Sequence, residues 1–201
     1  MRAPLRRAEK SSPSAPPGRD QRALDTSEFE ALFRECAGDV HGYLISLLRD
    51  RAAAEDIAAQ AFERLYRARS RLDRSRGTPR AWLFAIARNA ALDELRRRRR
   101  AQASGHGASP GASGSASEPV SRPAGGDAFE QAERRAAVAE ALAALPLRER
   151  ELVLLKFHGQ LTNGELARAL GISESNVGTR LHRALTHLRR HCAHTEGSEV
   201  A

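Results

Sequence analysis

The C-terminal stretch from residue 145 to residue 190 constrains the fold most strongly, because its pattern predicts three helices with the last two in helix-turn-helix spacing. Thr162 and Glu165 have the spacing of a capping box, which starts a helix. Gly171 follows that helix where a left-handed residue is needed to end it, and Ser173 can cap the next helix. The apolar face of this last helix is formed by residues at steps of four, four and three: Val177, Leu181, Leu185 and Leu188.

The outer face of the last predicted helix is polar and basic. A short helix, a tight glycine turn and a second helix with such a face form the geometry that enters a DNA major groove. An ordinary helical hairpin is the alternative explanation of the same pattern. On the DNA-binding interpretation, the candidate contact residues are Ser175, Asn176, Thr179, Arg180 and Arg183.

The composition favours an anionic partner. The chain has 201 residues, enough for one or two small domains, with 33 Lys and Arg against 25 Asp and Glu and a net charge of +8. Only Lys10 and Lys156 are lysines, so most of the positive charge is arginine, which suits bidentate contacts to phosphates and bases. No apolar run approaches a membrane span, no signal peptide is recognisable, and Cys36 and Cys192 do not suggest a disulfide framework. We therefore expect no membrane insertion and a cytoplasmic protein.

The N-terminal half divides into a tail and a helical domain. Residues 1–25 are polar and rich in proline, which predicts a disordered tail. Residues 26–100 carry apolar residues at helical spacing, with a candidate break at Gly38. Thr78 and Pro79 start the last helix of this domain, because proline at the first helical position loses no hydrogen bond.

A composition shift then separates a second module. Residues 101–126 consist mostly of Gly, Ser, Ala and Pro, which predicts a flexible linker with a root-mean-square span of roughly 28 Å. A second helical module is expected over residues 127–192, followed by a C-terminal tail over residues 193–201. Because no strand pattern occurs, we predict an all-α fold of two small helical modules joined by a flexible linker.

Three segments in this order resemble the extracytoplasmic-function sigma factors, the small members of the sigma-70 family. They are AEDIAAQAFERLY at 54–66, PRAWLFAIARNAALDELRRRRR at 79–100 and the helix-turn-helix stretch at 145–190. The resemblance covers about residues 27–100, which look like region 2, and residues 128–190, which look like region 4. It implies a dissociable specificity subunit of bacterial RNA polymerase, which is not itself an enzyme and requires no cofactor.

The resemblance also implies a task for each module. Region 2 would dock on the clamp of core RNA polymerase and open the −10 element of promoter DNA, while region 4 would bind near the flap and read the −35 element. Elements about 17 base pairs apart lie roughly 60 Å apart at about 3.4 Å per base pair, so the two modules must work at a distance. Members of this family are often held inactive by an anti-sigma factor, which makes such a protein a further candidate partner.

Two sets of residues would carry the contacts of region 2. The clamp would meet the polar side of the helix over 54–66, although a solvated face explains the same charges. The residues concerned are Glu55, Asp56, Gln60 and Arg64. Unstacked bases of the −10 strand would be held by the loop at 71–78 and the helix that follows it. The residues concerned are Arg74, Arg76, Arg80, Arg88 and Asn89. Trp82 could stack on a base, but we favour a place in the core.

Two other classes of function compete with a sigma factor. A stand-alone helix-turn-helix regulator would use its N-terminal module as a sensor, and would not need the segments at 54–66 and 79–100. A nucleic-acid enzyme is disfavoured, because the sequence shows neither a phosphate-binding glycine loop nor a convincing catalytic cluster. A metal could in principle bind near the C-terminus, where a solvated helix end is the preferred interpretation. The residues concerned are His187, His191, Cys192 and His194.

Overall fold

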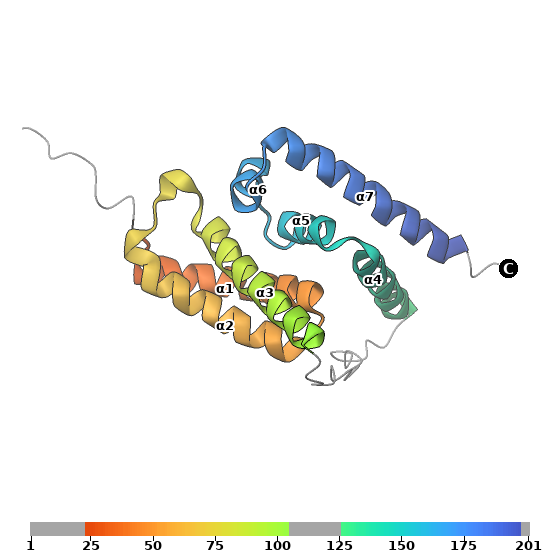
Figure 1. The fold of residues 1–201 in the computed structure, drawn as a ribbon, viewed down its shortest axis with the longest axis horizontal. Coiled ribbons are helices and arrows are strands. Elements are labelled where there is room, and N and C mark those ends of the chain that lie inside the picture. Colours follow the sequence, from red (N-terminus) through yellow and green to blue (C-terminus); the bar gives the residue numbers. More distant parts are fainter. Residues whose placement is uncertain (1–22, 105–125, 198–201) are drawn as a thin grey trace, which may run out of the picture.

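The computed structural model describes residues 23–104 and 126–197, and almost all of this described chain is helical. The helices are α1 (Thr26–Leu48), α2 (Arg51–Ala68), α3 (Pro79–Ala103), α4 (Gly126–Ala144), α5 (Leu147–Phe157), α6 (Asn163–Leu170) and α7 (Glu174–Gly197) (Figure 1). Two short 3-10 turns, η1 (Arg69–Arg71) and η2 (Arg74–Arg76), lie between α2 and α3. No strand occurs in the two described ranges, and the prediction of an all-α fold is confirmed.

The helices extend into the predicted linker and into the predicted C-terminal tail. α3 continues to Ala103 and α4 begins at Gly126, so both ends of the predicted linker at 101–126 are helical. α7 continues to Gly197, within the predicted tail at 193–201. Arginine and alanine are good helix formers, which explains why α3 does not end at its arginine run. The rest of the linker and most of the N-terminal tail lie outside the described residues.

The first module is a bundle of α1, α2 and α3. The N-terminus of α1 is held by a capping box, in which Asp25 accepts from the Glu28 amide and the Glu28 carboxylate accepts from the Asp25 amide. The break expected at Gly38 is wrong, because α1 runs through this exposed position without interruption. The core of the module is lined by α1 residues that are almost fully buried: Cys36, Val40, Tyr43, Leu44 and Leu47.

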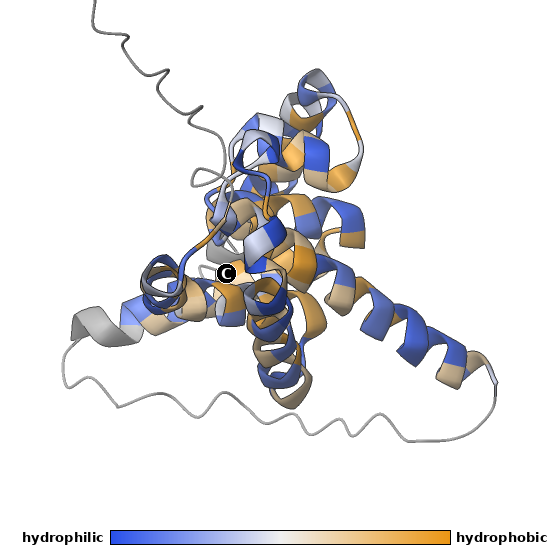
Figure 2. Ribbon diagram, turned by 90° about the vertical axis from the view of Figure 1, so that its left-hand side faces the viewer, coloured by the Kyte–Doolittle hydropathy of each residue, from blue (hydrophilic) through white to orange (hydrophobic). Residues whose placement is uncertain are grey.

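The helix α3 begins as predicted. The Thr78 hydroxyl accepts a hydrogen bond from the Ala81 amide at 3.2 Å, and Pro79 occupies the first turn. Leu83 and Phe84 are fully buried against α1 and α2, and the Phe84 ring meets the Tyr43 ring edge-on at 5.7 Å. The C-terminal part of α3 projects from the bundle and is largely hydrophilic (Figure 2).

The second module, α4 to α7, contains the predicted helix-turn-helix as α6 and α7. The capping box of Thr162 and Glu165 starts α6, and Gly171 ends it with a left-handed φ of 67°. The Ser173 hydroxyl accepts from the Asn176 amide at 3.3 Å at the start of α7. Each of these local predictions is confirmed, because each depends on groups only a few residues apart.

The two modules pack against each other through a shared core. Leu154, Leu155 and Leu166 of the second module belong to the same buried cluster as the core residues of α1 to α3. In Figure 1, α5 and α6 lie against the first module, while α7 crosses the outer side of α5. We call this closed packing of α5 and α6 on α1 and α3 the closed arrangement.

Within residues 23–104 and 126–197, no helix combines the length and the apolar character needed to cross a bilayer.

Candidate nucleic-acid interface

The outer face of α7 presents the residues predicted to read duplex DNA. Ser175, Thr179 and Arg183 are exposed on this helix. Arg180 is half-buried, and its Nε donates a hydrogen bond of 2.8 Å to the Asn176 side chain one turn earlier. The five predicted residues therefore lie on the first turns of α7, with three exposed side chains and two that are hydrogen-bonded to each other.

Gly178 lies in the middle of this face. A Cβ atom added at this position would meet nothing within 4 Å. The protein itself therefore does not require glycine here, and the backbone of α7 is open to a partner at this point.

Arg80, one of the residues predicted to hold the −10 strand, is turned toward the second module and not toward solvent. Its side chain is only 14% exposed, and it forms an ion pair with Asp39 of α1. It also donates to two backbone carbonyls at the end of α5, to His158 at 2.8 Å and to Gly159 at 2.7 Å. Arginine thus meets the negative end of a helix dipole, and in the closed arrangement Arg80 fastens the first module to the second.

Arg88 also contacts the second module, through a side chain of α5. Its Nε forms an ion pair with Glu151 of α5, and the two side chains are only 17% and 5% exposed. The Glu151 carboxylate also lies near Tyr43, a fully buried residue whose phenol pKa is raised, chiefly by burial and further by this negative charge. Asn89, next to Arg88, is exposed and accepts a hydrogen bond from it at 3.3 Å.

A third contact joins the N-termini of two helices. The Thr78 hydroxyl at the start of α3 donates a hydrogen bond of 2.6 Å to one carboxylate oxygen of Glu165. The other carboxylate oxygen of Glu165 accepts a hydrogen bond of 3.0 Å from the Thr162 amide. Burial acts to raise the pKa of Glu165, but the hydrogen bonds from Thr78 and Thr162 outweigh it, and the pKa is lowered. One carboxylate therefore serves the cap of α6 and the junction with α3.

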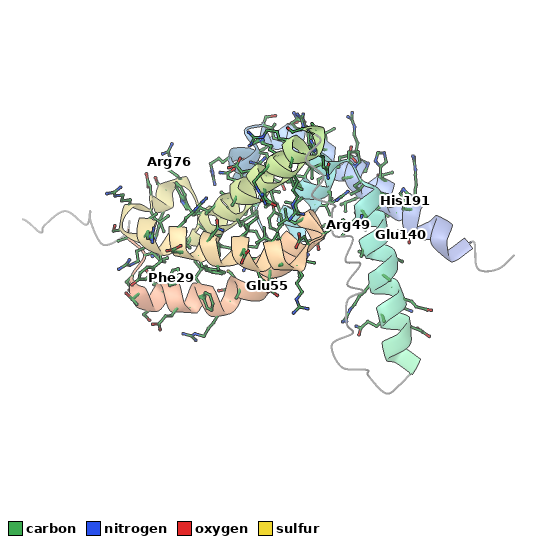
Figure 3. The ribbon with its side chains drawn as sticks, turned by 60° about the horizontal axis from the view of Figure 1, so that its bottom comes forward. Phe29, Arg49, Glu55, Arg76, Glu140 and His191 are labelled. Atoms are coloured by element: carbon green, nitrogen blue, oxygen red, sulfur yellow. The ribbon has the colours of Figure 1, made fainter. Side chains whose placement is uncertain are left out.

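The loop between α2 and α3 holds the other two arginines predicted to bind the −10 strand. Arg74 pairs with Glu28 of α1 at 2.6 Å, and this hydrogen bond is the main reason that the pKa of Glu28 is lowered. Arg76 is exposed at the outer end of the loop, away from the second module (Figure 3). Trp82 is partly buried against the core, in agreement with the core position that we favoured from the sequence.

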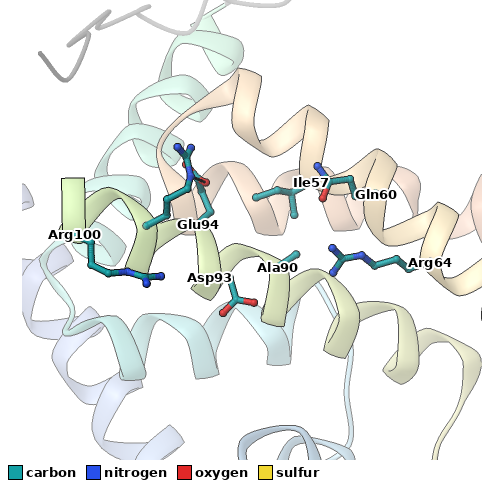
Figure 4. Close-up of a pocket in the computed structure, with 8 residues that line it drawn as sticks. Ile57, Gln60, Arg64, Ala90, Asp93, Glu94 and Arg100 are labelled. Carbon is teal, nitrogen blue, oxygen red and sulfur yellow. Dashed lines mark hydrogen bonds and ion pairs between the residues drawn. The ribbon is translucent and has the colours of Figure 1, made fainter. Parts of the chain in front are cut away.

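The predicted polymerase contacts lie on the outer side of α2. Asp56, Gln60 and Arg64 are exposed, as is Glu55, which pairs with Arg51 at 3.0 Å. Gln60 and Arg64 line a groove between α2 and α3, which faces Arg100 on the far side (Figure 4). This surface lies away from the second module and is accessible in the closed arrangement.

The C-terminal histidines form no metal site within the described residues. No group of three metal-ligating side chains was found there. The His187 ring instead lies 3.1 Å from the Glu149 carboxylate of α5, and the side chain of His194 lies outside the described residues.

The residues that hold the modules together were not predicted from the sequence. Glu151, His158 and Gly159 lie in or just after the first of the three helices predicted over residues 145–190, and none of them was a candidate site residue. A glutamate inside the apolar run of α5 was the available signal, because a carboxylate at a buried position requires a partner.

Comparisons with known proteins agree with this geometry. Residues 32–101 match the Sigma-70 region 2 family and residues 135–188 match the Sigma-70, region 4 family. The chain is 31% identical over 173 residues to the ECF RNA polymerase sigma factor RpoE of Cereibacter sphaeroides, covering 86% of this chain and 90% of that protein. It is also 31% identical to the ECF RNA polymerase sigma factor SigL of Mycobacterium tuberculosis, covering 83% and 90%.

Solved structures share the fold. The sigma factor RpoE of Bartonella quintana, in complex with the anti-sigma factor NepR, matches 83% of this chain and 97% of its own with a TM-score of 0.62 and 19% identity. CnrH, in complex with the cytosolic domain of CnrY, matches 83% and 88% with a TM-score of 0.57 and 22% identity. The first module is thus a region 2 rather than a sensor, and the chain belongs to the extracytoplasmic-function sigma factors, which direct bacterial RNA polymerase to promoters.

Proposed function

We propose that this sigma factor docks on the polymerase clamp through α2 and reads the −35 element through α7, while region 2 opens the −10 element. The observation that carries the proposal is that α2 and α7 both present exposed polar faces on opposite sides of the closed arrangement. The clamp face comprises Glu55, Asp56, Gln60 and Arg64, and the −35 face is centred on Thr179 and Arg183.

Contact with the −10 strand requires the closed arrangement to open. Arg80 donates to the His158 and Gly159 carbonyls, and Arg88 pairs with Glu151, so both contact the second module. Arg74, Arg76 and Asn89 lie at the surface. Opening would also let the two modules reach promoter elements roughly 60 Å apart. We therefore propose that the free protein binds promoter DNA weakly and gains its complete −10 surface only on core polymerase.

We also propose where this protein acts and which further partner it has. It acts in the cytoplasm, has no enzymatic activity of its own, and has an anti-sigma factor among its partners. Support for the last point comes from the similar structure of the sigma factor RpoE of Bartonella quintana, which is bound to the anti-sigma factor NepR.

In vitro transcription provides the test. Core polymerase with and without this protein would be supplied with a library of genomic fragments, and the start sites would be mapped. We expect new start sites that depend on the protein and share two sequence elements. Tight sequence-specific binding by the free protein, with no effect on start-site choice, would refute the proposal.

A further inference from the structure

A partly open cavity of about 420 Å³ lies between the two modules and is lined by residues of both. One wall is the exposed flank of α3, and the other comprises α5 and the junction of α6 with α7. Its volume is in the range of small-molecule sites. Part of the wall is apolar, formed by Leu92, Leu95, Leu147, Leu152, Leu170 and Ile172.

The polar part of the wall is strongly basic. It contains five arginines and a single acidic residue, Glu151. That carboxylate is already paired with Arg88, and Arg96 pairs with Asp93 at 2.7 Å. The remaining three arginines are Arg99, Arg148 and Arg180, and within the described residues none of them forms an ion pair with a carboxylate. The Arg180 Nε donates to the Asn176 side chain, which leaves its terminal nitrogens for a ligand.

These three guanidinium groups come from three different helices. Arg99 is on α3, Arg148 is on α5 and Arg180 is on α7. Arg99 and Arg148 are exposed and Arg180 is half-buried, so solvent screens their mutual repulsion. A bound anion would be attracted to all three groups and therefore to both modules.

The type of anion follows from the charge and the shape of the wall. Guanidinium groups bind phosphate through paired hydrogen bonds, and three of them match a multiply charged group better than a single carboxylate. The leucine and isoleucine side chains offer an apolar surface for the rest of the molecule. We propose that this cavity binds a phosphorylated small molecule with a planar or apolar body, such as a nucleoside polyphosphate.

Such a ligand would act as a brake on the sigma factor. Because its site is complete only when the modules are in contact, it stabilises the closed arrangement by linkage. The closed arrangement keeps Arg80 and Arg88 engaged by the second module, so the ligand would oppose contact with the −10 strand. This regulatory consequence rests on the proposed function, whereas the binding itself does not.

Binding can be measured on the full chain without polymerase or DNA. We would titrate the protein with ATP as the probe at constant ionic strength, and follow binding by equilibrium dialysis and the melting temperature by fluorimetry. We expect saturable binding and a melting temperature that rises with ATP. Arg99→Gln and Arg148→Gln should each weaken binding about tenfold, because each removes one charge-assisted contact.

Matched controls separate this site from general attraction to a basic protein. Arg135→Gln makes the same charge change on the exposed surface of α4, away from the cavity, and should leave ATP affinity unchanged. Inorganic triphosphate should bind more weakly than ATP, because it cannot use the apolar wall. Equal losses in all three variants, or equal affinity for ATP and triphosphate, would overturn the inference.

The readouts also separate this inference from the proposed function. ATP binding that depends on Arg99 and Arg148 supports the inference even if the protein directs no initiation. Normal promoter-specific initiation by a protein that binds no ATP would overturn the inference and leave the proposed function intact.

Discussion

Glu151 of α5 and Arg88 of α3 form an ion pair across the boundary between the two modules, and both side chains are largely buried. A buried charge that loses its partner is costly, so this pair makes the closed arrangement sensitive to a single substitution. The same arginine belongs to the set proposed to bind the −10 strand.

Glu151→Gln should therefore open the protein. The change leaves Arg88 without its counter-charge, and we expect a loss of about 1–3 kcal/mol in stability against urea. Fluorescence energy transfer between dyes on α2 and α7 should report greater separation, and a −10 single-strand oligonucleotide should bind more tightly. Damage to the fold would weaken oligonucleotide binding. Tighter binding by a variant that is changed only in region 4 would therefore indicate that the modules have separated.

Glu149→Gln is the matched control for this experiment. Glu149 is on the same helix, but its partner is His187 within the second module. This variant should keep the wild-type dye separation and strand affinity. If Glu149→Gln and Glu151→Gln behave alike, the ion pair with Arg88 does not hold the modules together.

Arg80→Lys tests the hydrogen bonds to the end of α5. Lysine keeps the charge but lacks the planar fork that reaches both the His158 and Gly159 carbonyls, so we expect a loss of about 1–3 kcal/mol in unfolding free energy. Arg76→Lys, at an exposed position in the same region, should leave stability unchanged. Equal stability of the two variants would show that the Arg80 contacts contribute nothing.

The stability of the protein should depend on pH through His158. Burial lowers the pKa of this ring, and the opposing effect of Asp39 is smaller. The unfolded chain therefore binds a proton more readily, so the contribution of neutral His158 is complete above about pH 6.5 and is lost as the pH falls below that value. Urea unfolding at several pH values would measure this slope.

A substitution at the same position identifies the group responsible. His158→Gln should flatten the pH dependence between about pH 5 and 7, whereas His182→Gln, at an exposed position on α7, should not. An unchanged slope in His158→Gln would assign the dependence to other groups.

Gly178→Ala should stabilise α7 by about 1 kcal/mol, because glycine in a helix interior is unfavourable and no atom of the protein lies within 4 Å of the added Cβ. A thermal melt would measure the gain. If glycine is only tolerated, initiation at −35-dependent promoters should be unchanged or better, which is the result that we expect. A more stable variant with defective initiation would show that DNA approaches the backbone closely at this point.

Asp56→Arg should weaken association with core polymerase and leave the fold intact, because the side chain lies on the exposed face of α2. Pull-down of core polymerase and a thermal melt separate the two effects. Glu30→Arg makes the same charge change on an exposed position of α1 and serves as the control. Wild-type affinity in Asp56→Arg would remove this residue from the clamp surface.

The sequence by itself determined the local features of this protein. The capping box of Thr162 and Glu165, the start of α3 at Pro79 and the left-handed Gly171 were all predicted, and the structure contains them. These features depend on backbone groups within one helical turn, so neighbouring residues are enough to specify them. The wrong expectation at Gly38 shows the limit of such rules. The helix continues past this exposed glycine because its neighbours Cys36 and Val40 pack in the core.

Only the tertiary structure decided how the charged residues are used. Arg80 and Arg88 have the same local pattern as arginines that face solvent, yet their partners are Asp39 on α1 and groups on α5 that lie beyond the linker. A side chain finds such partners only after two modules have packed, and the packing depends on apolar surfaces spread over several helices. Sequence spacing therefore identified the positive charges of the candidate site, but the contact between modules determines which of them are free to bind DNA.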